Sequence, residues 1–150
     1  MRILLQVVQN ASVVISGEEV ASIQKGYLLF VGFTEGDDAS VARKMAEKVC
    51  KLRLFPDETG KTNKGLKDVD GQILSVSQFT LYASVKEGNR PSFTSSMSKE
   101  PAGSLYETFF AYLKELWPNS RSGVFHADMK VGLVNDGPFT LILDSKELFA

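Results

Sequence analysis

The uncharged run from Tyr27 to Phe33 restricts the fold of this chain more than any other segment. Every residue in it is apolar or glycine, and Lys25-Gly26 breaks the chain just before it. A short continuous apolar run bounded by turn residues is typical of a strand that is buried on both faces. We therefore expect this segment to lie in the interior of a sheet.

Strand-like and helix-like segments surround this central run. Seven further segments rich in β-branched and apolar residues predict strands, at 3–8, 12–16, 19–23, 72–81, 123–127, 129–134 and 139–144. Apolar residues at helical spacing predict one helix from the N-cap candidates at 36–38 to Leu52, and a second over 101–117. Residues 55–71 predict an irregular loop or hairpin, and 85–99 a surface loop.

These elements predict an α+β fold, as a single domain over residues 1–150. We expect about eight strands, in mostly antiparallel sheets that form a sandwich or barrel-like core, together with two helices. No repeat, linker or low-complexity segment divides the chain.

Composition limits the environment and the partners. No apolar segment approaches the roughly 18 residues that cross a bilayer, so no membrane partner is expected. The single cysteine, Cys50, excludes an internal disulfide and fits a reducing compartment, so we expect a cytoplasmic protein. A net charge of −1 is unlike that of proteins that grip many phosphates. If RNA is the partner, the contact must be small or its positive charge must be local.

The common signatures of catalysis and cofactor binding are missing. The sequence contains no phosphate-binding loop, no dinucleotide-binding glycine motif and no paired histidine or cysteine motif for a metal. With one His and one Cys, a zinc site would need carboxylates to complete it, so we predict neither a metal nor a cofactor. A triad of Ser77, His126 and Asp128 is conceivable, but His126 and Asp128 lie two apart on or near one strand, where such pairs are commonly a solvated face.

Two polar segments interrupt apolar strands. By itself, Ser77-Gln78-Phe79-Thr80-Leu81 fits a half-buried strand whose hydroxyls satisfy neighbouring backbone groups. By itself, Asn135-Asp136-Gly137-Pro138-Phe139-Thr140 fits a tight turn between two strands. Together, in this order and at this spacing, the two segments resemble the signature motifs of the D-aminoacyl-tRNA deacylases, the D-tyrosyl-tRNA deacylase family.

The resemblance covers essentially the whole chain. Further segments with similar residues in the family are Gln6–Val8, Ala11–Val13, Arg53–Phe55, Gly88–Phe93, Leu105–Glu107 and Phe125–Met129. One position departs from the pattern: the family usually carries an arginine after the first glutamine, which steadies the Gly-Pro loop, and this chain has Val7. Since the valine side chain cannot donate a hydrogen bond, either another group holds the loop here or the loop geometry is looser.

The resemblance implies a homodimeric hydrolase that cleaves the ester between a D-amino acid and the terminal ribose of tRNA. It implies that Gly137-Pro138 is a cis peptide inserted into the active site of the partner subunit, where two backbone carbonyls accept hydrogen bonds from the substrate's α-ammonium group. An L side chain would then clash with the protein, whereas a D side chain would point outward. Glycine has no side chain to exclude, so mischarged glycyl-tRNA is an expected substrate as well.

The resemblance also assigns residues near the ester. The backbone N–H groups around Phe79 and Thr80 are the implied oxyanion donors, and Ser77 and Gln78 are expected to help bind the 3′-terminal adenosine. In the family the ribose 2′-hydroxyl of the RNA assists hydrolysis. A covalent role for the Thr80 hydroxyl is the rival mechanism, although no base stands beside it in the sequence.

Further residues are matched at the pocket and on the surface. Phe125, Met129 and Ala102 correspond to positions that line the family's pocket, and ordinary core packing is their other interpretation. Lys86 and Arg90 are candidates for phosphate contacts with tRNA. Two other functions stay open: a relative with a trans Gly-Pro unit that clears a small L-amino acid from tRNA, and a non-catalytic tRNA-binding module.

Overall fold

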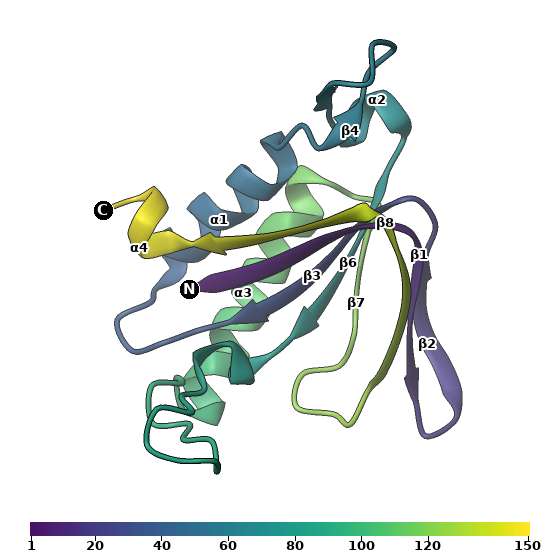
Figure 1. The fold of residues 1–150 in the computed structure, drawn as a ribbon. Coiled ribbons are helices and arrows are strands. Elements are labelled where there is room, and N and C mark those ends of the chain that lie inside the picture. Colours follow the sequence, from purple (N-terminus) through teal and green to yellow (C-terminus); the bar gives the residue numbers. More distant parts are fainter.

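Two long strands from opposite ends of the chain run side by side in the main sheet (Figure 1). In the computed structural model, which describes residues 1–150, β1 spans Arg2–Ile15 and β8 spans Lys130–Asp144. The pair is antiparallel, and its register shifts only between Gln6 and Asn10 of β1. The sequence predicts two shorter strands in each region. They form one strand each because pairing continues on both sides of the irregular stretch.

Four further strands complete the six-stranded main sheet: β2 (Glu18–Ile23), β3 (Gly26–Gly32), β6 (Gln72–Ser77) and β7 (Ser120–Ser122). The order is β2-β1-β3-β6-β7, and β8 pairs with β1. The β3–β6 and β6–β7 pairs are parallel and the other pairs are antiparallel, so the sheet is mixed. β4 (Phe55–Pro56) and β5 (Thr62–Lys64) form a separate hairpin in the region predicted as a loop or hairpin.

Two long helices cover one face of the sheet (Figure 1). α1 spans Ala39–Lys51, and its N-cap Asp38 accepts a hydrogen bond from the Val41 N–H at 2.9 Å. It lies in the long connection between the parallel strands β3 and β6, which no tight turn can join. α3 spans Lys99–Leu116. Both predicted helices are confirmed, and two single-turn helices accompany them, α2 (Leu66–Val69) and α4 (Ser145–Leu148). None of the helices is long and apolar enough to span a membrane.

The core has two parts, one on each face of the sheet. Twenty-two buried residues pack between the sheet and the helices, among them Leu5, Tyr27 and Phe109. Eight more, among them Val13 and Leu28, fill the concave face, where the curved sheet nearly closes. β3 contributes Tyr27 to the first part and Leu28 to the second, so the prediction of a strand buried on both faces is confirmed, as are the single α+β domain and its barrel-like core.

One predicted strand is wrong in part and another is wrong altogether. The strand expected over 72–81 ends at Ser77, and a 3-10 helix, η1, spans Phe79–Tyr82. The chain turns because the Gln78 carbonyl accepts from the Leu81 N–H at 3.3 Å, an i to i+3 bond that strands do not make. The strand expected over 123–127 is a turn, in which His126 has a φ of 66° that extended backbone cannot adopt.

Candidate active site

A cavity of about 760 Å³ opens where β3 and β6 end. Its lining is Val31, Gly32, Phe33, Val76, Ser77, Gln78, Phe79, Phe93, Thr94, Ser96, Met97, Ser98, Lys99, Ala102, Phe125, His126, Ala127, Asp128, Met129 and Val131. Six of the residues predicted from the sequence are among them: Ser77, Gln78, Phe79, Ala102, Phe125 and Met129. The fold thus brings these six residues together, although Ser77 and Met129 lie 52 positions apart in the sequence.

Ser77, Gln78 and Phe79 form one corner of this cavity. The Gln78 N–H donates to the Val31 carbonyl at 2.7 Å, which continues the β3–β6 pairing by one residue before η1 begins. A Cβ on Gly32 would lie 2.8 Å from the Gln78 carbonyl oxygen, so glycine permits this close approach. The N–H groups at the first positions of η1, those of Phe79 and Thr80, have no acceptor within the helix.

Thr80 lies beside the cavity and does not line it. Its side chain is exposed, and its Oγ1 accepts a hydrogen bond from Gln78 Nε2 at 2.6 Å. No carboxylate or imidazole is hydrogen-bonded to the Thr80 hydroxyl, so the structure contains no general base paired with it.

Phe125 and Ala102 stand on the α3 side of the cavity. The Phe125 ring stacks against Tyr106 with ring centroids 6.0 Å apart, and a Cβ on Gly103 would lie 3.1 Å from the Phe125 ring. Tyr106 is itself fixed, because its hydroxyl is hydrogen-bonded to Ser75 Oγ at 2.9 Å and to Ser122 Oγ at 2.8 Å. Burial raises the pKa of Tyr106, although both hydroxyl contacts lower it in part.

The wall formed by residues 93–98 was not predicted from the sequence, where it falls within a polar loop. Phe93 meets Phe79 edge-on with ring centroids 5.1 Å apart. The Ser96 hydroxyl donates to the Phe79 carbonyl at 2.9 Å, and the Met97 N–H donates to the Phe33 carbonyl at 3.0 Å. Only the serine and phenylalanine content of this segment could have indicated it, and such content is common in exposed loops.

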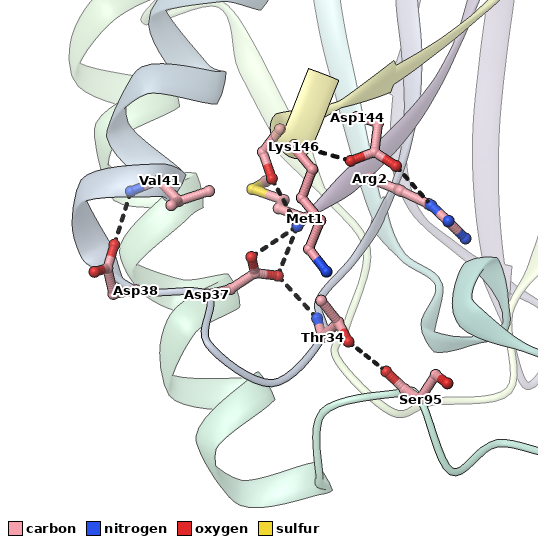
Figure 2. A network of polar contacts seen from close by, with 10 residues as sticks. Met1, Arg2, Thr34, Asp37, Asp38, Val41, Ser95, Asp144 and Lys146 are labelled. Carbon is pink, nitrogen blue, oxygen red and sulfur yellow. Dashed lines mark hydrogen bonds and ion pairs between the residues drawn. The ribbon is translucent and has the colours of Figure 1, made fainter. Parts of the chain in front are cut away.

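A polar network behind this wall ties it to the amino-terminal end of the described chain (Figure 2). Thr34 Oγ1 donates to the Ser95 carbonyl at 2.6 Å, and the Thr34 N–H donates to Asp37 Oδ2 at 2.8 Å. Asp37 in turn pairs with the buried Met1 ammonium group at 2.7 Å. Burial lowers the pKa of that ammonium group, and its contacts with Asp37 offset this in part. The turn between β3 and α1 is thus anchored where it supports the cavity wall.

Ser77, His126 and Asp128 all line the cavity but do not form a triad. The Asp128 carboxylate pairs with Lys130 Nζ at 3.1 Å, and no hydrogen bond joins it to His126 or joins His126 to Ser77. No group of three or more His, Cys, Asp or Glu side chains stands close enough to hold a metal ion.

The Gly137-Pro138 unit lies outside the cavity of its own chain. Both residues are exposed on β8, and the peptide bond between them is cis. Asn135 spans this loop: its Oδ1 accepts from the Phe139 N–H at 2.8 Å, and its Nδ2 donates to Thr140 Oγ1 at 2.8 Å. A side chain within the loop therefore supplies hydrogen bonds that Val7 cannot.

Val7 and the two basic candidates also stand apart from the cavity. Val7 is only 4% exposed and belongs to the core between sheet and helices. Gln6 Nε2, next to it in the sequence, donates to Thr140 Oγ1 at 3.3 Å. Lys86 and Arg90 are exposed in the polar loop and do not line the cavity.

Comparisons with known proteins agree with the resemblance seen in the motifs. The family model described as D-Tyr-tRNA(Tyr) deacylase matches residues 4–144. A D-aminoacyl-tRNA deacylase from Lactobacillus acidophilus is 53% identical and the match covers 96% of this chain and 99% of the relative. A D-aminoacyl-tRNA deacylase from Petrotoga mobilis is 49% identical, with 99% and 100% covered.

Two solved structures have the same fold. A c-Myc DNA unwinding element binding protein matches with a TM-score of 0.90 at 36% identity, over 96% of this chain and 98% of that one. A probable eukaryotic D-amino acid tRNA deacylase matches with a TM-score of 0.84, over 95% and 97%, and at 16% identity this likeness concerns the fold alone. From its motifs, its fold and its full-length relatives, the chain belongs to the D-Tyr-tRNA(Tyr) deacylase family.

Proposed function

We propose that the protein hydrolyses the ester bond of D-aminoacyl-tRNA, releasing the D-amino acid and tRNA. The observation that carries this proposal is the position of Ser77, Gln78 and Phe79 at one corner of the large cavity, in a chain about half identical to curated deacylases. The cavity is open, largely apolar and edged by exposed aromatic rings, features that suit the end of an RNA chain that carries an amino acid.

Backbone groups are proposed to stabilise the transition state. Helical N–H groups point toward the N-terminal end of their helix, and the residues at that end of η1 line the cavity. The N–H groups of Phe79 and Thr80 therefore suit an oxyanion in the cavity. Water adds to the ester carbonyl carbon, the bond to the ribose oxygen breaks, and the ribose oxygen takes up the proton that the water loses, which gives a free hydroxyl. The ribose 2′-hydroxyl is proposed to assist, because no protein base is paired with Thr80.

Selection of the D form is assigned to Gly137 and Pro138 of a partner subunit. Both are exposed and neither lines the cavity of its own chain. A loop that acts in the active site of a partner subunit must have both properties. Two carbonyls without a side chain at Gly137 are suited to the substrate's α-ammonium group. An L side chain would then clash with the protein. Glycine has only a hydrogen at that position and does not clash, so glycyl-tRNA is proposed as a further substrate.

Contacts with tRNA outside the cavity are assigned to Lys86 and Arg90. Both are exposed in the 85–99 loop, whose end forms the cavity wall, and neither is in a salt bridge. With a net charge of −1, the protein offers only a local attraction for phosphate, which favours release of tRNA after hydrolysis.

A deacylation assay tests the proposal directly. The protein is mixed with D-tyrosyl-tRNA, L-tyrosyl-tRNA, glycyl-tRNA or L-alanyl-tRNA, and the remaining ester is measured over time. Hydrolysis of the D-tyrosyl and glycyl esters alone is the expected result. Preferential cleavage of the L-alanyl ester would indicate an enzyme that clears a small L-amino acid, and tRNA binding without any hydrolysis would indicate a binding module.

The proposed subunit exchange has its own test. Two inactive variants, Phe79→Pro and Gly137→Val, are expressed together and the mixed dimer is isolated with two affinity tags. If the loop acts in the partner's cavity, one cavity of the mixed dimer has both parts intact, and activity returns to about half that of the wild type. A folded, fully active monomer would refute the exchange.

A further inference from the structure

We infer that Ser96 is a positioning residue for hydrolysis: its hydroxyl orients the Phe79–Thr80 peptide so that the Thr80 N–H faces the ester carbonyl oxygen. This inference rests on the function proposed above and deepens it. Ser96 stands in the polar loop, outside both signature motifs.

The contact that carries the inference is a single hydrogen bond. Ser96 Oγ donates to the Phe79 carbonyl oxygen at 2.9 Å, and Ser96 is half-buried in the cavity wall. A trans peptide unit is planar, and its C=O and N–H bonds point in opposite directions. A hydrogen bond that holds the Phe79 carbonyl therefore also holds the direction of the Thr80 N–H.

Ser96 is itself held from both sides. The Thr34 hydroxyl donates to the carbonyl of Ser95 at 2.6 Å, a contact seen in Figure 2. The Met97 N–H donates to the Phe33 carbonyl at 3.0 Å. Since these two bonds tie the residues before and after Ser96 to the end of β3, the Ser96 hydroxyl approaches η1 from a fixed position.

The first two residues of η1, where this bond is received, have little support of their own. η1 has four residues, and short 3-10 helices have poorer hydrogen-bond geometry than α-helices. Phe79 is 49% exposed and Thr80 is also exposed, so packing holds this peptide only weakly. An oxyanion donor stabilises a transition state only if its direction is set beforehand. The Ser96 hydroxyl supplies this constraint from the carbonyl side of the peptide.

The test compares kcat and KM for hydrolysis of D-tyrosyl-tRNA by the wild type, Ser96→Ala, Ser96→Cys and Ser96→Thr. Loss of a whole oxyanion donor lowers kcat by about 100- to 1,000-fold, so misdirection of one donor should lower it by about tenfold, with KM changed less than about twofold. Ser96→Cys keeps the size of the side chain but has only a weak donor, and should be as slow. Ser96→Thr keeps the hydroxyl and should restore most of the rate. Ser104→Ala, an exposed serine on α3 whose side chain makes no hydrogen bond, is the matched control.

A merely structural role predicts a different outcome. Ser96→Ala would then melt at a lower temperature but keep the wild-type kcat per folded molecule, and that result overturns the inference. If the alanine variant does not fold, the cysteine variant decides, because a wild-type kcat in Ser96→Cys refutes the role equally. The Thr80 amide resonance in nitrogen–proton NMR spectra should shift in Ser96→Cys, and an unchanged resonance contradicts the inference. If the wild type does not hydrolyse D-tyrosyl-tRNA, the proposed function fails together with the inference. If the wild type is active but the Ser96 variants keep its kcat, only the inference fails.

Discussion

Replacement of Asn135 by alanine tests how the Gly137-Pro138 loop is held in a chain that lacks the family's arginine. Asn135 makes two hydrogen bonds across the loop, each 2.8 Å long: its Oδ1 accepts from the Phe139 N–H, and its Nδ2 donates to Thr140 Oγ1. Asn135→Ala removes both and leaves the Phe139 N–H without that acceptor. We therefore expect the loop to leave its present conformation more often in the variant.

The two lost bonds set the size of the effect. A neutral hydrogen bond contributes about 0.5–1.5 kcal/mol, so the pair contributes about 2 kcal/mol, which corresponds to a change of about 30-fold in the loop equilibrium. If Gly137 and Pro138 bind the substrate's ammonium group, kcat/KM for D-tyrosyl-tRNA should fall by about 5- to 30-fold. Discrimination against L-tyrosyl-tRNA should weaken as well. The melting temperature should fall by no more than about 4–8 °C, because the loop is exposed and the core is intact.

The assay measures kcat/KM on the D and L esters together with hydrogen exchange of the Phe139 amide. Asn135→Asp is the matched control: its carboxylate still accepts from the Phe139 N–H, and the Thr140 hydroxyl is able to donate to it. The aspartate variant should thus stay close to the wild type, while the alanine variant exchanges the Phe139 amide faster. Full activity and unchanged D selectivity in Asn135→Ala would refute the reasoning, and would assign the loop conformation to packing of the flanking strands.

Three further predictions follow from named contacts. Thr80→Ala should lower the single-turnover rate by less than about tenfold, because the proposed donors are backbone groups, whereas complete loss and a trapped acyl-enzyme in the wild type would make Thr80 a nucleophile. Burial alone raises the pKa of Asp144, but hydrogen bonds from Arg2 and from the Lys146 N–H bring it below 3.8. The ionised carboxylate thus stabilises the fold above pH 3.8, and this stabilisation is lost as the pH falls through the folded-state pKa. In urea denaturation, Asp144→Asn should therefore be less stable than the wild type at neutral pH, and the difference should close below pH 3.8. A difference that does not change with pH would contradict this. Val7→Arg should lower the free energy of unfolding by about 3–5 kcal/mol in chemical denaturation, because it places an unpaired charge in the core. Unchanged stability together with stronger rejection of L esters would contradict this, and would show that an arginine at position 7 can still hold the Gly137-Pro138 loop.

Local patterns in the sequence were sufficient for much of the fold. The apolar run from Tyr27 to Phe33 identified the strand buried on both faces, and apolar residues at helical spacing identified both long helices. These features are readable because the period of a helix or strand is set by its own backbone. Six residues that line one cavity were also located from the sequence, three in the first polar motif and three at other matched positions, but that success came from resemblance to a family and not from periodicity.

Other features depend on contacts between distant residues, and only the tertiary structure decided them. β6 ends at Ser77 and η1 begins at Phe79 because the Val31 carbonyl, which accepts from the Gln78 N–H, is the last hydrogen-bond acceptor that β3 provides for this segment. The polar segment around Ser96 looks like an ordinary surface loop, yet it forms a cavity wall because Thr34 and Phe33 bind it from another part of the chain. The Val7 side chain packs in the core, and the Gly137-Pro138 loop is held instead by hydrogen bonds from the Asn135 side chain. A propensity describes one residue and its neighbours, whereas these hydrogen bonds join groups brought together only by the folded sheet.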